Sequence, residues 1–94
     1  MLRHIVVFKF KDQASKASRR AAIERLKKFC GQSPLLAEYR IEESLDQRKG
    51  HNLVQNTLLK DGATIEQWRN DPKHKEFVKY MSQLADWLIA DYEE

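Results

Sequence analysis

The order in which two hydrophobic periodicities follow one another along the 94 residues constrains the fold more than any other feature. Alternation with a period of two predicts strands, and apolar residues three and four apart predict helices. The expected strands are residues 3–11, 36–45, 52–60 and 87–92, and the expected helices are 15–30, 64–70 and 72–85. The order β-α-β-β-α-α-β predicts an α+β, ferredoxin-like fold with an antiparallel four-stranded sheet and a broken second helix. At this length it forms one domain, residues 1–94.

Capping residues indicate where the expected helices begin and end. Gly31 follows the first helical stripe, where a glycine is typical of a helix C-terminus. Thr64 with Gln67 three residues later forms a capping box. Asp71 is an N-cap residue followed by Pro72, which is favoured at the first helical position because it lacks an N–H group. These signals place one short helix directly before the last one.

Both faces of the first strand contain apolar residues. The face that we expect to pack against the helices carries His4, Val6, Phe8 and Phe10. Ile5 and Val7 lie on the other face of this strand, which is central in the expected topology. Because 33% of the residues are charged, a domain this small has a thin core. We therefore expect two copies to bury their second sheet faces against each other as a homodimer.

Several classes of protein are excluded by composition. The apolar run at residues 5–8 is too short for a signal peptide or a membrane span. The single cysteine, Cys30, excludes an internal disulfide and a cysteine-based metal cluster, so we expect a cytoplasmic protein. The net charge of +3 comes from interspersed residues, and the basic groups at 16–20 and 27–28 lie on an outer helix face. We expect no nucleic-acid partner and no membrane partner.

Two of the three histidines lie where the expected fold brings them together. His4 begins the first strand, and His74 lies in the first turn of the last helix, on its apolar stripe. Both positions fall at the end of the sheet where the third strand finishes, so the two imidazoles should meet between sheet and helices. A helix N-terminus disfavours the protonated form of His74, which leaves a neutral imidazole as a general base. The alternative is that both are core residues hydrogen-bonded to the backbone; His51, after Gly50 in a turn, is expected to be exposed.

Other chemistries have less support in the sequence. Asp71 with two histidines could supply metal ligands, but Asp71 is already explained as an N-cap and no His-x-x-x-His spacing occurs. Cys30 lies at a helix C-terminus, where the helix dipole raises a thiol pKa, so it is expected to be a small buried apolar residue. There is no glycine-rich phosphate loop. We expect no metal and no cofactor.

Three segments carry a family resemblance: residues 3–11, 71–77 and 87–92. Within the second, Asp71-Pro72-Lys73-His74 is similar to a His-Pro-x-His motif, with Asp in place of the first His. Over essentially the whole chain, in order and spacing, the sequence resembles the stress-responsive dimeric α/β-barrel (Dabb) family. The resemblance implies a homodimer in which two sheets pack into a central barrel with the helices outside.

What the resemblance implies about activity is more limited. Most similar proteins have no assigned activity, and some plant members are heat-stable stress proteins. One plant member is a polyketide cyclase whose two principal histidines match His4 and His74. Leu26 and Trp68 stand where that cyclase has pocket tyrosines, and Leu53 stands at its third histidine. The pair of imidazoles is therefore retained, but the phenols are not.

The favoured hypothesis is a homodimer that binds a small, partly apolar molecule near His4 and His74. The expected pocket lining is Val6, Phe8, Leu26, Leu53, Trp68, Phe77 and Met81. As an enzyme, it would remove a proton next to a carbonyl, with His74 as base and His4 holding the substrate oxygen. One alternative is a non-catalytic stress or structural oligomer with a filled interior. A small cyclase, an isomerase or a cofactor-free monooxygenase on the same barrel is supported by fold analogy alone.

Overall fold

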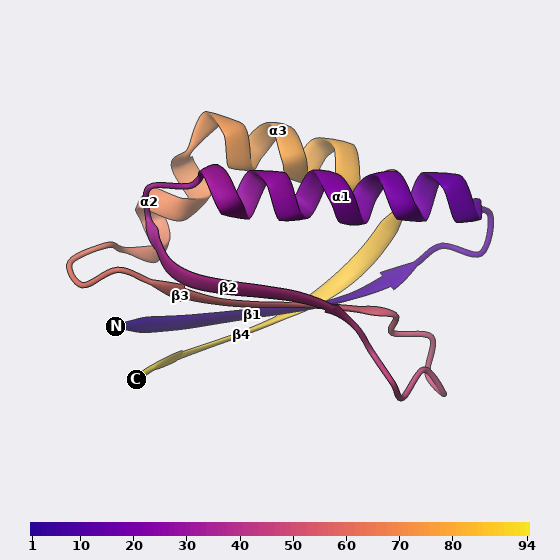
Figure 1. Cartoon of the computed structure of the whole chain (residues 1–94), viewed down its shortest axis with the longest axis horizontal. Helices are drawn as coiled ribbons and strands as arrows, with labels where there is room; N and C mark the ends of the chain where they lie inside the picture. The colour runs from indigo at the N-terminus through magenta and orange to yellow at the C-terminus, as the bar shows by residue number, and fades with distance from the viewer.

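The computed structural model describes residues 1–94 and has the expected order of elements. The strands are β1 (Leu2–Phe10), β2 (Leu36–Glu43), β3 (Leu53–Leu59) and β4 (Ala85–Glu93), and the helices are α1 (Lys16–Gln32), α2 (Ile65–Asn70) and α3 (Pro72–Met81). All neighbouring strands pair antiparallel in the order β2-β3-β1-β4. The helices cover one face of this sheet and leave the other without a helix (Figure 1). This arrangement confirms the predicted ferredoxin-like fold. None of the helices is long and apolar enough to cross a membrane.

Alternation along the central strands separates the two sheet faces. The buried rows that face the helices are His4, Val6, Phe8 and Phe10 of β1 and Leu53, Gln55, Thr57 and Leu59 of β3. Ile5 and Val7 point to the other face and are only half-buried. The predicted face of β1 is thus the one that packs against the helices. We call the opposite side the open face; it carries Ile5, Val7, Val54, Leu58, Leu88, Ala90 and Tyr92.

The end of α1 differs from the expectation. Gly31 is not the capping glycine: the helix continues to Gln32, Ser33 is the C-cap, and Gly31 has no positive φ. A Cβ atom at Gly31 would lie 2.9 Å from the Tyr39 hydroxyl oxygen of β2. The glycine therefore allows the tyrosine ring to lie close to the helix. The other two caps are confirmed, because Thr64 and Gln67 form the capping box of α2 and the Asp71 carboxylate accepts a hydrogen bond from the backbone N–H of Lys73.

Three other boundaries also moved. The apolar stripe predicted a helix to residue 85, but α3 ends at Met81. Ala85 instead pairs with Phe10, so β4 begins two residues earlier than predicted. The second strand was predicted to reach Leu45, which lies outside β2 and is fully exposed. Each shift reflects pairing with a neighbouring strand, which periodicity within one segment does not report.

Candidate functional site

A cavity of about 200 Å³ lies between the sheet and the helices. Its wall is mostly apolar and comes from β1, β3, β4 and all three helices. The lining residues are His4, Val6, Phe8, Phe29, Gln55, Trp68, Arg69, His74, Phe77, Val78, Met81, Trp87 and Ile89. Both predicted histidines are among them. The few polar groups in an otherwise apolar wall make this cavity the candidate site.

His4 is held in one orientation by the neighbouring edge strand. The antiparallel register places His4 of β1 opposite Asp91 of β4, and His4 Nδ1 lies 2.5 Å from Asp91 Oδ1. An ionised carboxylate only accepts hydrogen bonds, so Nδ1–H donates and Nε2 is the ring nitrogen left for a ligand. The Thr57 hydroxyl donates to the backbone carbonyl of His4 at 2.6 Å, which ties the strand to β3. Only 5% of His4 is exposed, so its ring has little freedom to turn.

His74 reaches the same cavity from the helix layer. It is the third residue of α3, whose start is set by Asp71 and Pro72. Burial lowers the pKa of the His74 imidazole below its usual value, and the nearby His4 lowers it further, while the Arg69 carbonyl and Asp71 oppose the shift. The direction agrees with the prediction, but the main cause is burial rather than the helix N-terminus. A neutral His74 at pH 7 can accept a proton.

Trp68 packs between the two imidazoles. Its ring centroid lies 5.9 Å from that of His4 and 5.1 Å from that of His74, and Phe29 lies 5.2 Å away on the α1 side. Trp68 is 1% exposed, and its indole Nε1 has no hydrogen-bond partner. The indole therefore forms a rigid wall shared by both histidines.

The expected lining residues fall into two groups. Those that line the cavity are Val6, Phe8, Trp68, Phe77 and Met81. Leu26 and Leu53 do not line it, although both are completely buried. They pack in the core away from the cavity. A position predicted to face inward can belong either to the filled core or to a cavity wall, and the sequence pattern does not distinguish the two. His51 was expected to be exposed but is half-buried, and it lines a surface pocket together with Val7 of the open face.

The lining residues that were not singled out from the sequence are Phe29, Gln55, Arg69, Val78, Trp87 and Ile89, and Asp91, which supports His4, was also missed. Asp91 belongs to the expected last strand, and its period-two neighbours Trp87 and Ile89 line the cavity. Gln55 lies in the third strand, in a buried row that alternates with half-buried residues. A polar residue within such a buried row is the signal that would have identified Gln55.

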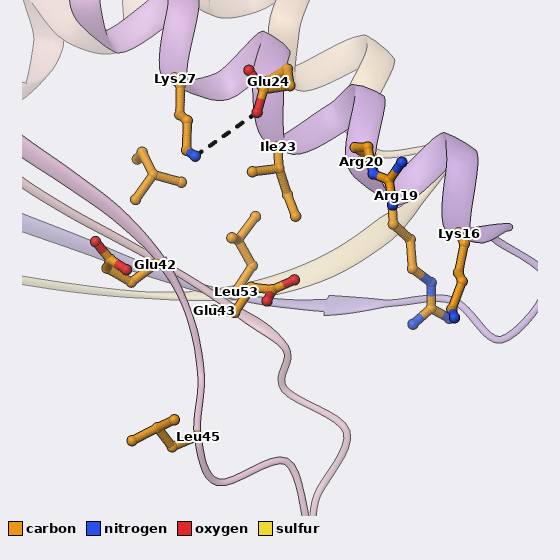
Figure 2. A pocket seen from close by; sticks show the side chains of 11 residues that line it. Lys16, Arg19, Arg20, Ile23, Glu24, Lys27, Glu42, Glu43, Leu45 and Leu53 are labelled. Carbon is orange, nitrogen blue, oxygen red and sulfur yellow. Dashed lines mark ion pairs between the residues drawn. The ribbon is translucent and has the colours of Figure 1, made fainter.

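A larger hollow of about 790 Å³ runs between α1 and the end of β2 (Figure 2). Its rim is charged, with Lys16, Arg19, Arg20, Glu24 and Lys27 on the helix and Glu42 and Glu43 on the strand. Lys27 Nζ lies 3.9 Å from Glu24 Oε1, the pair joined by a dashed line in the figure. No histidine or cysteine lines this groove.

Cys30 is a buried residue of α1 with 1% of its surface exposed. Burial raises the pKa of its thiol to about 12. Since only the thiolate is an effective nucleophile, Cys30 should react with Ellman's reagent at pH 8 only after unfolding. Rapid labelling of the folded protein, compared with a guanidinium-unfolded control, would contradict this prediction.

No group of three or more His, Cys, Asp or Glu residues is placed so that it could hold a metal ion.

Comparisons with known proteins identify the family. Residues 2–94 match the family described as Stress responsive A/B Barrel Domain, or Dabb. The uncharacterized protein SCO4036 of Streptomyces coelicolor is 27% identical over 96 residues, which cover 99% of each chain.

Two solved structures share the fold. A dimeric ferredoxin-like protein of unknown function from Thermobifida fusca has a TM-score of 0.82 at 20% identity, over 99% of this chain and 90% of that one. Hydroxynitrile lyase from Passiflora edulis has a TM-score of 0.83 at 20% identity, over 97% and 90% of the two chains. The chain described here belongs to the Dabb family of stress-responsive A/B barrel domains.

Proposed function

We propose that this protein binds a small, partly apolar molecule in the cavity beside His4 and His74. The observation that carries the proposal is an unfilled cavity of about 200 Å³ bordered by two imidazoles. Apolar cavities of about 150 Å³ in other proteins bind benzene, so this volume corresponds to a molecule with a single ring. A purely structural oligomer would have no need for such a space, because filling it with side chains would stabilise the fold.

The two histidines suit complementary roles in proton transfer. His74, whose pKa is lowered by burial, is the base that takes a proton from a carbon next to a carbonyl. His4 is fixed by Asp91 through Nδ1; with a proton on both ring nitrogens, its Nε2–H donates a hydrogen bond to the carbonyl oxygen as negative charge develops there. The proton moves to His74 and the electron pair of the C–H bond moves into the enolate. The lyase name of the Passiflora edulis protein is consistent with catalysis on this fold.

We propose in addition that the protein is a homodimer joined through the open face. Leu88 and Tyr92 are 65% and 51% exposed there, and Ile5 and Val7 lie beside them on β1. Monomeric proteins seldom expose an apolar patch that extends over several neighbouring strands, as this one does over β3, β1 and β4. The dimer described for the Thermobifida fusca protein of the same fold supports this assembly.

Replacing His4 and His74 together by glutamine tests the proposed binding site. We expect the double variant to keep its far-UV circular dichroism spectrum. It should bind single-ring aromatic amides about tenfold more weakly or worse, because both imidazoles that could hydrogen-bond the ligand are removed. Ligand-observed NMR titrations measure this change. His51→Gln, which removes an imidazole outside the cavity, serves as the matched control. Equal affinities for the double variant and the control would refute the proposed site.

A further inference from the structure

Two polar residues interrupt the buried row of β3, and only one of them has a partner. The row runs Leu53, Gln55, Thr57, Leu59 on the helix-facing side. Thr57 is completely buried, and its hydroxyl donates to the carbonyl of His4. Gln55 is 4% exposed and lines the cavity, but its amide makes no hydrogen bond to any other residue of the chain. The Thr57 hydroxyl thus has a hydrogen-bond partner within the chain, whereas the Gln55 amide has none.

Leaving an amide unpaired inside a protein costs about 1–3 kcal/mol. A leucine or methionine at residue 55 would avoid that cost, since the neighbouring strand residues Val6 and Ile41 are apolar and buried. Trp68 Nε1 is the only polar side-chain atom that is both fully buried and without a hydrogen-bond partner. The side-chain oxygen and nitrogen of Gln55 also lack a partner, so they must keep some accessible surface. What surface Gln55 keeps borders the cavity, so its amide can be satisfied from there.

The strand register places this amide close to His4. His4 pairs with Thr57, and Val6 pairs with Gln55, so His4 and Gln55 are diagonal neighbours on the same face of β1 and β3. Diagonal neighbours in an antiparallel pair lie about 7–8 Å apart, within reach of long side chains. A single polar group in the cavity can therefore lie beside both the amide and the imidazole.

We infer that Gln55 selects ligands with a neutral carbonyl group that carries an adjacent N–H, such as a carboxamide or lactam, on a ring-sized apolar body. This inference rests on the proposed function of the cavity. An amide is both a donor and an acceptor, so its complement is a group that offers both. A carboxylate in the same place offers only acceptors and loses its hydration among apolar walls, which is unfavourable.

The test compares three probes of similar shape: benzamide, benzoate and toluene. For the native protein, ligand-observed NMR should show benzamide binding about tenfold more tightly than toluene or benzoate, as expected for two net hydrogen bonds. In Gln55→Leu this preference should disappear while toluene still binds, and the midpoint of thermal unfolding should rise. Gln83→Leu, which changes an exposed glutamine after α3, is the matched control and should leave the preference intact. Gln55→Met keeps the length of the side chain and provides the same comparison if the leucine variant does not fold.

The outcomes separate this inference from the proposed function. Toluene binding as tightly as benzamide to the native protein, or a benzamide preference that survives in Gln55→Leu and Gln55→Met, would overturn the role of Gln55 and leave the binding cavity standing. Failure of all three probes to bind the native protein at millimolar concentration would overturn the proposed function and the inference together.

Discussion

Replacing Trp68 by alanine should lower the free energy of unfolding by about 3–5 kcal/mol, a large part of the 5–15 kcal/mol that typically stabilises a domain. Trp68 is completely buried and packs against Phe29, His4 and His74. Truncation removes these contacts and extends a cavity that already measures about 200 Å³. Urea unfolding followed by far-UV circular dichroism measures the loss, because that signal does not depend on tryptophan.

Two further variants make this prediction specific to the buried wall of the site. Trp68→Phe keeps an aromatic ring and removes the Nε1–H that has no partner, so it should cost much less than alanine. Trp87→Ala removes the same side chain from a half-buried position on β4 and should also cost less. A loss at Trp68→Ala no larger than that at Trp87→Ala would contradict the packing described here.

The fold could be predicted because its information is local. Alternation along β1 was sufficient to identify His4, Val6 and Phe8 as the residues facing the helices. Asp71 and Pro72 were sufficient to set the start of α3, and with it the position of His74. Gly31 was misinterpreted because a glycine can either end a helix or make room for a neighbouring side chain. Only the position of the Tyr39 ring shows that Gly31 has the second role.

The details of the site depend on registers between strands that are distant in the sequence. Asp91 stands in an acidic segment that ends with Glu93 and Glu94, which in isolation is typical of a solvated terminus. It meets His4 only because β1 and β4 pair with Leu2 opposite Glu93, and a shift of one residue would have turned Asp91 to the open face. The partners of a side chain across a sheet cannot be predicted from alternation within one strand.

Helix and strand periodicity likewise cannot tell a cavity wall from a filled core. Leu26 and Leu53 have the same inward orientation as Val6 and Met81, and all four are buried. Only Val6 and Met81 border the cavity, because the packing of α2 and α3 over the sheet leaves space beside them. The location of the cavity is thus a property of packing between elements.

Replacing Leu88 by lysine should convert a dimer at micromolar concentration into a monomer. Leu88 lies opposite Val7 on the open face, where β4 and β1 pair. In a two-fold interface the substitution occurs twice, and desolvating each ammonium group costs several kcal/mol. Since about 1.4 kcal/mol corresponds to a tenfold change in affinity, the dissociation constant should rise at least about a thousandfold. Sedimentation velocity over a range of concentrations measures this change directly.

The matched control places the same charge on the helix layer. Ala21 is an exposed residue of α1, on the opposite side of the sheet from Leu88, and Ala21→Lys should leave the sedimentation coefficient unchanged. A dimer that persists in Leu88→Lys would exclude the open face as the interface, and a native protein that sediments as a monomer would exclude the dimer altogether. The cavity lies on the helix side of the same sheet, so the monomeric variant also shows whether ligand binding needs the partner. Unchanged benzamide affinity in Leu88→Lys would mean that each chain carries a complete site.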